Sequence, residues 1–318
     1  MKKIIFIICF CFVFILKGFT QQDPQYTQYM YNQNVVNPAY VTNDLGVINF
    51  GVMHRRQWTS AVGTPKTYNF FVHAPLSNNI EAGLSIVTDD IGDGVLKENN
   101  FYADFAYMIN VSEGHKLSFG LKAGFTSFNT NFNGFRFPDE DITTGFIPND
   151  LAFENQNKTF VNFGAGLFYF TDKYYIGAAI PNLVKGEHFE ENNGLNSIGG
   201  EEIHLFVNGG YVFHVSDLLK LKPSFMAKAV KGSPLVVDTA VNVLFDDKFE
   251  AGLAYRVNDA ISVMFNIRVL DSFRFGYAFD YTTTNLGSFN SGTHEFMLLF
   301  DFDTLGLKKG YDKSPRFF

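Results

Sequence analysis

Seven histidines and one neighbouring serine are the side chains of this sequence that could support catalysis. No two histidines form an H-x-x-x-H or H-E-x-x-H pattern, so the common helical zinc motif is excluded. Ser291 and His294 are close enough in sequence to act as a nucleophile and a base, but no third group near them could orient the histidine. A G-x-S-x-G elbow, a P-loop and a dinucleotide fingerprint are also absent. We therefore predict no catalytic residue and no cofactor, and we expect that the protein is not an enzyme.

An acidic stretch with glycines, DDIGDG at residues 89–94, could supply oxygen ligands to calcium. Its spacing differs from that of an EF-hand loop, and no closing glutamate follows at the required offset. A solvated turn is the favoured interpretation, so we predict no metal site.

A cluster of interface-type residues comprises Arg55, Arg56, Gln57 and Trp58. Arginine and tryptophan are frequent anchors of protein interfaces, so the four residues are candidates for binding a protein partner. The alternative is structural. The tryptophan would then lie in the aromatic belt at a membrane–water boundary, and an arginine would pack inside a barrel.

The first residues indicate the compartment in which these side chains work. Two lysines precede an unbroken apolar run at residues 4–16, and Lys17 follows that run. This order predicts a secretory signal peptide, residues 1–20, with cleavage near Thr20, because the run is short for a membrane-spanning helix. A retained N-terminal anchor is the alternative.

Cysteine content and charge narrow the function of the exported chain. Both cysteines, Cys9 and Cys11, lie in the apolar run, so the mature chain is predicted to have no disulfide, thiolate metal site or N-terminal lipid. Removing residues 1–20 takes away three lysines and no acidic residue, so the net charge moves from -7 to -10. An acidic chain does not suit nonspecific binding to nucleic acid.

The remaining sequence alternates between apolar and small or polar residues. From Phe273 to Tyr281, aromatic residues occupy every second position, and Arg, Gly, Ala and Asp occupy the others. The mean hydropathy is near zero although 17% of the residues are aromatic. A soluble sheet would carry many long charged residues on its wet face, whereas small residues with single charges suit a narrow lumen. We therefore predict an all-β fold, a transmembrane antiparallel β-barrel in the outer membrane.

The period-two segments define the strands of this barrel. Fourteen are expected, near residues 46–54, 66–74, 80–88, 99–109, 115–128, 158–170, 173–181, 202–214, 220–230, 235–245, 248–256, 260–269, 272–282 and 293–302. Long connections are expected at residues 55–65, 89–98, 129–157 and 182–201, and short ones at 75–79, 110–114 and 171–172. Short periplasmic turns and long outer loops are typical of outer-membrane barrels, and an even strand count places both termini in the periplasm.

The segment before the first strand does not alternate and is rich in Gln, Asn and Tyr. We predict a periplasmic arm that folds under or into the barrel. It would contact periplasmic machinery or plug the barrel, or else act as a structural lid that satisfies polar groups of the lumen. Its candidate partner-binding residues are Tyr29, Tyr31, Asn34, Asn37 and Pro38.

Five blocks of the sequence resemble one known family. They are QYTQYMYNQNVVNPAY (25–40), RRQWTSAVGTPKTYNFFVHAPL (55–76), KYYIGAAIPNL (173–183), LKPSFMAKAVKGSP (221–234) and FRFGYAFDYTTTNLGSFNSGTHEFML (273–298). In order and content they resemble the PorP/SprF family of the Bacteroidota type IX secretion system.

The resemblance implies an outer-membrane accessory of type IX secretion and gliding motility. Such a protein anchors or helps to export a large adhesin that carries a type IX C-terminal domain, and some members associate with the periplasmic ring. The expected surroundings are outer-membrane lipid and lipopolysaccharide. The expected domains are the signal peptide (1–20), the periplasmic arm (21–45), the barrel (46–303) and a periplasmic tail (304–318). A porin or a transporter of hydrophobic compounds is the alternative function.

Overall fold

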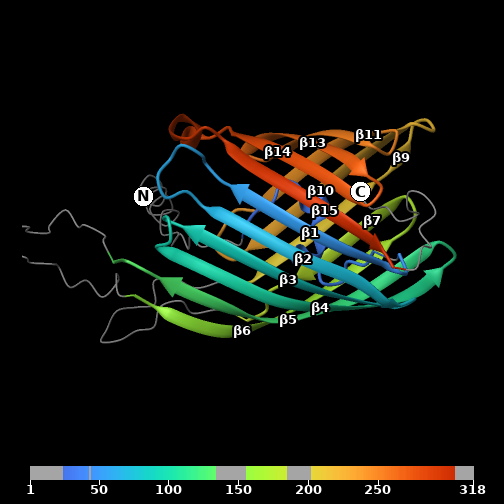
Figure 1. Cartoon of the computed structure of the whole chain (residues 1–318), viewed down its shortest axis with the longest axis horizontal. Coiled ribbons are helices and arrows are strands. Elements are labelled where there is room, and N and C mark those ends of the chain that lie inside the picture. The colour runs from blue at the N-terminus through green and yellow to red at the C-terminus, as the bar shows by residue number, and fades with distance from the viewer. Residues whose placement is uncertain (1–23, 43, 134–154, 185–201, 305–318) are drawn as a thin grey trace, which may run out of the picture.

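The chain forms one antiparallel sheet that closes on itself as a barrel (Figure 1). The computed structural model describes residues 24–42, 44–133, 155–184 and 202–304. Within this part of the chain, no helix is long and apolar enough to cross a membrane.

Fifteen strand segments and three short helices make up the described chain. The strands are β1 (Val47–Arg56), β2 (Lys66–Ser77), β3 (Ile80–Ile91), β4 (Leu96–Ser112), β5 (His115–Thr130), β6 (Asn157–Phe170), β7 (Tyr174–Ile180), β8 (His204–Tyr211), β9 (Phe213–His214), β10 (Leu219–Val230), β11 (Val236–Phe245), β12 (Phe249–Arg256), β13 (Ala260–Leu270), β14 (Phe273–Thr282) and β15 (Thr293–Asp303). The helices are η1 (Tyr29–Tyr31), α2 (Gln33–Val36) and η3 (Asn285–Phe289).

The ring closes through the pairing of β1 with β15, from Val47–Asp303 to Arg56–His294. Each other neighbour pair is also antiparallel, and β10 joins β11. β9 continues β8 after one interrupting residue, and both pair with β10, so the fifteen segments occupy fourteen positions. The predicted fourteen-stranded antiparallel barrel is confirmed.

Alternation along each strand separates the two faces of the wall. On β5, Phe119 and Leu121 point outward, while Ser118, Gly120 and Lys122 point into the lumen. The Leu121 side chain is 65% exposed, whereas Lys122 is only 2% exposed. Because the outward residues are apolar on nearly every strand, this face suits hydrocarbon, and the polar residues are left to line the interior.

The two ends of the barrel differ in their connections. At the short-turn end, the connections are residues 78–79, 113–114, 171–173, 215–218, 246–248 and 271–272. At the long-loop end, the longer connections are residues 57–65, 131–156, 181–203 and 283–292. β1 starts and β15 finishes at the short-turn end.

The expected long connection at residues 89–98 is wrong. β3 and β4 continue pairing as far as Ile91–Leu96, which leaves a four-residue turn. Positive φ angles at Gly92, Asp93 and Gly94 make this turn possible, and two of the three positions are glycines, which adopt such angles easily. A hydrogen bond from the Lys66 ammonium, 2.6 Å away, lowers the pKa of Asp93. The acidic stretch is therefore a hairpin turn with a surface ion pair.

Two expectations lie outside the described residues. They are the signal peptide at residues 1–20 and, apart from Thr304, the tail at residues 304–318.

Candidate functional site

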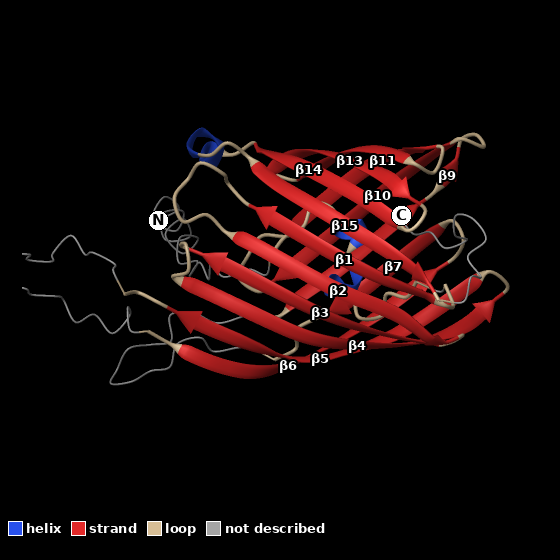
Figure 2. Ribbon diagram, viewed as in Figure 1, coloured by secondary structure: helices blue, strands red, loops and turns tan. Residues whose placement is uncertain are grey.

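The N-terminal segment fills the lumen of the barrel. Residues 26–42 are buried throughout, apart from the half-buried Val35, and Figure 2 shows their two helical turns, η1 and α2, inside the ring of strands. We call residues 24–42 the plug. The sequence analysis gave this region as a periplasmic arm that folds under or into the barrel, and its described part lies within the barrel.

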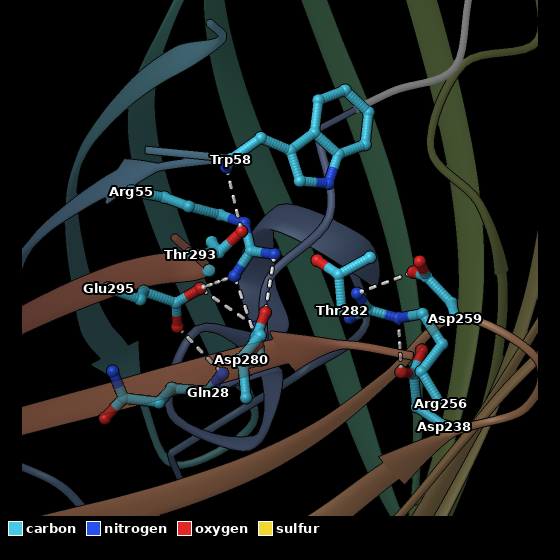
Figure 3. A network of polar contacts seen from close by, with 12 residues as sticks. Gln28, Arg55, Trp58, Asp238, Arg256, Asp259, Asp280, Thr282, Thr293 and Glu295 are labelled. Atoms are coloured by element: carbon cyan, nitrogen blue, oxygen red, sulfur yellow. Dashed lines mark hydrogen bonds and ion pairs between the residues drawn. The ribbon is translucent and has the colours of Figure 1, made fainter. Parts of the chain in front are cut away.

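The plug is anchored near the long-loop end by two buried carboxylates. Glu295 accepts hydrogen bonds from the backbone N–H groups of Thr27 (2.9 Å) and Gln28 (2.8 Å). The Thr27 hydroxyl donates to Asp280 at 2.7 Å. Arg55 binds both acids, at 2.7 Å to Asp280 and 2.9 Å to Glu295 (Figure 3). We call these five residues the anchor cluster.

All three charged side chains of the anchor cluster are nearly inaccessible, with exposures of 1 to 4%. Removing charges from water is costly unless opposite charges and hydrogen bonds compensate them. Arg55 compensates two carboxylates, and the plug supplies three further donors. The plug is therefore part of what makes the buried charges tolerable.

A second ion pair lies next to the anchor cluster. Arg256 on β12 donates to Asp238 on β11 at 2.7 Å and reaches Asp259 at 3.4 Å (Figure 3). Close to it, the Tyr29 hydroxyl donates to Ser224 at 3.2 Å. The wall therefore holds this plug tyrosine as well.

Tyr31 ties the plug to the half of the lumen nearer the short-turn end. Its hydroxyl donates to Glu250 and accepts from Asn266 at 3.1 Å. Glu250 also binds Lys222 at 2.8 Å and accepts from Asn242 at 2.6 Å. This buried carboxylate is shared between the wall and the plug, as Glu295 is.

On β5, β6 and β7 the plug approaches glycines of the wall closely, through its backbone at Gly120 and through the Asn37 side chain at Gly166 and Gly177. A Cβ atom on Gly120 would lie 2.1 Å from the Ala39 nitrogen, and one on Gly166 would lie 2.1 Å from the Asn37 Oδ1. Only glycine permits these approaches. Asn37 also donates to the Leu167 carbonyl at 3.0 Å. The bend at residues 37–39 therefore fits a groove that the glycines leave open.

Lys122 completes this side by holding plug carbonyl groups. Its ammonium donates to the carbonyls of Asn34 (3.3 Å) and Val35 (2.9 Å) and lies 3.6 Å from Asp104. Here the plug carbonyls accept hydrogen bonds from a cation. In the anchor cluster, by contrast, N–H and hydroxyl groups of the plug donate to carboxylates.

The plug leaves the lumen near the short-turn end. Thr42 donates to Glu81 through its backbone N–H at 2.7 Å and through its hydroxyl at 3.0 Å. Glu81 also lies 3.1 Å from His73. The plug therefore runs from the long-loop end at Thr27 to the short-turn end at Thr42.

Comparison with known proteins identifies the family to which this barrel belongs. The model of the family described as type IX secretion system membrane protein PorP/SprF matches residues 18–300. The chain belongs to the PorP/SprF family. No curated protein matches the sequence.

Solved structures resemble this PorP/SprF protein in fold alone. The toluene transporter TbuX of Ralstonia pickettii gives a TM-score of 0.51 at 9% identity, covering 85% of this chain and 93% of its own. A FadL homologue of Pseudomonas aeruginosa gives 0.41 at 14% identity, covering 81% and 89%. Omp33 of Acinetobacter baumannii gives 0.44 at 8% identity, covering 82% and 100%. The protein is an outer-membrane β-barrel of the type IX secretion system.

The four residues of the predicted interface cluster separate in this PorP/SprF protein. Arg55 is buried in the lumen, while Arg56 points outward from the same strand. Gln57 and Trp58 lie at the rim of the barrel, half-buried. The Trp58 backbone N–H donates to Thr293 at 3.1 Å. The rim candidates are therefore three residues, because Arg55 belongs to the anchor cluster.

The rim near Trp58 is held in a strained shape. Trp58 and Ser60 have φ angles of 51° and 78°, which are rare for residues with side chains. Thr59 bonds Gly292 and Ser291 of the neighbouring loop, through its N–H at 2.8 Å and its carbonyl at 2.7 Å. These bonds fix the two loops to each other.

The serine and histidine considered for catalysis have other partners. The Ser291 hydroxyl lies 2.5 Å from the Ser60 hydroxyl, and His294 lies 2.7 Å from the Tyr277 hydroxyl. In the part of the chain that the structure describes, no group of three acidic, histidine or cysteine side chains could hold a metal ion.

The five plug candidates all lie inside the barrel, where Tyr29, Tyr31, Asn34 and Asn37 make the bonds given above and Pro38 packs on Gly120. Sequence reasoning did not identify the charged wall residues that hold the plug as a whole. Glu250 and Lys122 bind the candidates Tyr31 and Asn34, Asp280 and Glu295 bind Thr27 and Gln28, Glu81 binds Thr42, and Lys222 pairs with Glu250. Each is a single charge on the inward face of an alternating strand. That signal was present, but nothing in the sequence paired those charges with the plug.

Proposed function

We propose that this PorP/SprF protein is a non-enzymatic accessory of type IX secretion that anchors, or helps to export, a large cell-surface adhesin. The family and the fold support a secretion-related role in the outer membrane. The adhesin would be recognised through its type IX C-terminal domain, and periplasmic ring components are further partners. Outer-membrane lipid and lipopolysaccharide surround the barrel.

The filled lumen is the observation that carries this proposal. A conduit for solutes needs a continuous water-filled path, whereas here the protein's own chain crosses the lumen from one end to the other. Buried carboxylates and glycine contacts hold the plug at several heights. A rigid, filled barrel suits a protein whose task is to hold a partner at the membrane.

The rim supplies a surface for that partner. Arg56 is the last residue of β1, and Gln57 and Trp58 begin the connection from β1 to β2. The hydrogen bonds between loops 57–65 and 283–292 fix this surface before binding, which lowers the entropic cost of association. We propose that this rim contacts the secreted partner.

We infer the orientation of the barrel from the difference between its two ends. Short turns face the periplasm and long loops face outward in outer-membrane barrels. With the short-turn end in the periplasm, β15 ends on the periplasmic side and the rim faces the cell surface. The plug then opens toward the cell surface at residue 24 and joins β1 on the periplasmic side.

Affinity purification tests the proposal. The full-length barrel, tagged at its C-terminus and extracted in mild detergent, is expected to bring down one large secreted protein in repeated preparations. A variant with Gln57→Ala and Trp58→Ala should lose most of that protein while keeping its folded mobility on gels. Recovery of the barrel alone from cells that secrete the adhesin would contradict the proposal.

A transporter of hydrophobic compounds is the alternative function. The supporting observation is a small cavity of about 60 Å³ between the plug and the wall, lined in part by Tyr102, Phe206 and Met226. Steady current through the intact protein in planar bilayers would favour a channel, and electrical silence would favour the anchor.

A further inference from the structure

Positive charges on the outer face of the barrel are gathered in one place. In the described strands, alternation turns most lysines and arginines toward the lumen, Lys122 and Lys222 among them. Three side chains point outward instead, those of Arg56 at the end of β1, Lys66 at the start of β2 and Lys97 near the start of β4. All three lie at the long-loop end, on strands that are side by side with only β3 between β2 and β4 (Figure 1). We call Arg56, Lys66 and Lys97 the basic patch.

The basic patch keeps a positive charge after its carboxylates are counted, although the whole chain is acidic. Lys66 binds Asp93 at 2.6 Å, and Asp90 lies between Lys66 and Lys97 in the strand register. Three cations and two carboxylates leave one net positive charge. Arg56 and Lys97 form no ion pair with any residue that the structure describes. The patch therefore has capacity for a further anion.

Arg56 is the member of the patch that most needs an anion. Its direct neighbours in the sheet are Lys66 on β2 and His294 on β15. Like charges directly opposite each other on adjacent strands destabilise a sheet, and His294 lies 2.7 Å from the Tyr277 hydroxyl. The Arg56 side chain is exposed, so its guanidinium N–H groups can bind a ligand that approaches from outside the barrel.

Aromatic and apolar side chains begin directly beneath the basic patch. His54 and Tyr68 form the next outward pair along β1 and β2, and their rings stack with centroids 4.4 Å apart. Val52 and Phe70 follow, with exposures of 41% and 42%. Tyrosines gather where the apolar band of a barrel meets the headgroups, and two residues of a strand span about 7 Å. The patch therefore lies at headgroup depth, above a surface that suits acyl chains.

The opposite side of the barrel presents a different surface at the same end. There the outward residues are Thr239 on β11, Tyr255 on β12 and Ile261 on β13, which lie opposite one another. Among the described residues at this end of β11 to β13, no lysine or arginine faces outward. The basic patch is therefore local to one side of the ring.

We propose that the basic patch binds the phosphate group of an anionic membrane lipid, with Arg56 as the main ligand. A guanidinium group binds phosphate through two parallel hydrogen bonds, which a single ammonium group does not match. The acyl chains of the lipid would then lie along Val52 and Phe70. A lipid is the occupant because it presents an anion and a hydrocarbon chain in the same order as this surface presents cations and apolar side chains.

The inference goes beyond the proposed anchoring of an adhesin. It uses the proposed orientation only to assign the lipid to the outer leaflet. It also stands independently of the secreted partner, because the affinity purification changes Gln57 and Trp58 and leaves Arg56 in place.

Fluorescence quenching by brominated lipids tests the inference. The chain has one tryptophan, so Trp58→Phe gives a background without tryptophan. Tyr68→Trp then reports beneath the basic patch, and Tyr255→Trp is the matched control on the opposite side. Each folded barrel is placed in phosphatidylcholine vesicles that contain a small fraction of brominated phosphatidic acid or the same fraction of brominated phosphatidylcholine. If the Tyr68 variant does not fold, Phe70→Trp replaces it.

The Tyr68→Trp reporter should show about fivefold preference for phosphatidic acid over phosphatidylcholine, the contribution of one cation near a membrane surface. Tyr255→Trp should show none. Adding Arg56→Gln should abolish the preference, whereas Lys231→Gln, which removes a cation from the connection between β10 and β11, should leave it unchanged. Excess inorganic phosphate should not displace the lipid, because it lacks the acyl chains.

Three results would overturn the inference. They are equal preferences at the two reporters, a preference that survives Arg56→Gln, and a preference that Lys231→Gln lowers as much as Arg56→Gln does. Displacement by inorganic phosphate would show a site for free anions and would also contradict a lipid as the occupant.

Discussion

The two sides of the lumen hold the plug by opposite means. On the side of β1 and β12 to β15, buried carboxylates accept hydrogen bonds that the plug donates, as Glu295 does from Thr27 and Gln28. On the side of β5 to β7, glycines let the plug backbone and the Asn37 side chain touch the wall, and Lys122 donates to plug carbonyls. We call these the carboxylate side and the glycine side.

The difference teaches how a short segment can be fixed without a core of its own. Two helical turns cannot satisfy their backbone groups internally, so the wall must supply acceptors for N–H groups and donors for carbonyls. The carboxylate side supplies the acceptors and Lys122 the donor, while the glycine side sets the position by shape. Substitutions that remove a charge on the carboxylate side and substitutions that fill space on the glycine side should therefore have different effects on the protein.

The largest effect is expected from breaking the charge balance on the carboxylate side. Arg55→Ala leaves Asp280 and Glu295 buried without their cation, which should lower the free energy of unfolding by about 3 to 5 kcal/mol. Urea unfolding in liposomes, followed by tyrosine fluorescence or gel mobility, measures this change.

Arg56→Ala is the matched control, because this neighbouring arginine points outward. Its effect should stay within about 0.5 kcal/mol. Equal losses in the two variants would show that the anchor cluster contributes nothing specific.

A smaller effect is expected on the glycine side. Gly120→Ala places a methyl group about where the Ala39 backbone nitrogen is, and the backbone cannot yield as a flexible side chain can. Overpacking of this kind costs about 1 to 3 kcal/mol. The plug should be displaced while the strands stay paired, so solute leak from liposomes should rise.

Leu121→Ala is the control for this glycine, because the leucine is adjacent and faces lipid. It should leave leak unchanged. If the Gly120→Ala barrel leaks no more solute than the wild type, the close fit at the glycines is not needed to hold the plug in place.

The outer wall could be predicted from the sequence, and the inner contacts could not. Alternation decides which residues face lipid, and it depends only on neighbouring positions, so the aromatic row from Phe273 to Tyr281 identifies its strand and the two faces of that strand together. The partners of Tyr31 lie more than two hundred residues away on β12 and β13. Such pairs depend on the register and closure of the whole ring, which one sequence does not reveal.

The same distinction explains why two predictions from the sequence, the long loop at residues 89–98 and the single patch at residues 55–58, failed in part. The turn at residues 92–95 was expected to be a long loop because DDIGDG is polar, yet continued pairing of β3 and β4 overrides composition. Arg55 and Arg56 were grouped as one patch, although successive residues of a strand face opposite sides.

The smallest effect is expected for one hydroxyl group. Tyr31→Phe removes the bond to Glu250 and the one accepted from Asn266, but this carboxylate keeps Lys222 and Asn242. The cost should be about 1 to 2 kcal/mol, the value of two hydrogen bonds. Tyr255→Phe, on the lipid-facing side of β12, is the control and should not change the unfolding midpoint.

The central claim is that the N-terminal segment closes the lumen, and deletion of residues 24–38 in planar bilayers tests it most directly. The intact protein should be electrically silent, whereas the deletion variant, with the same folded gel mobility, should give steady open channels. A silent deletion variant, or an intact protein that conducts as well as the variant, would contradict the account.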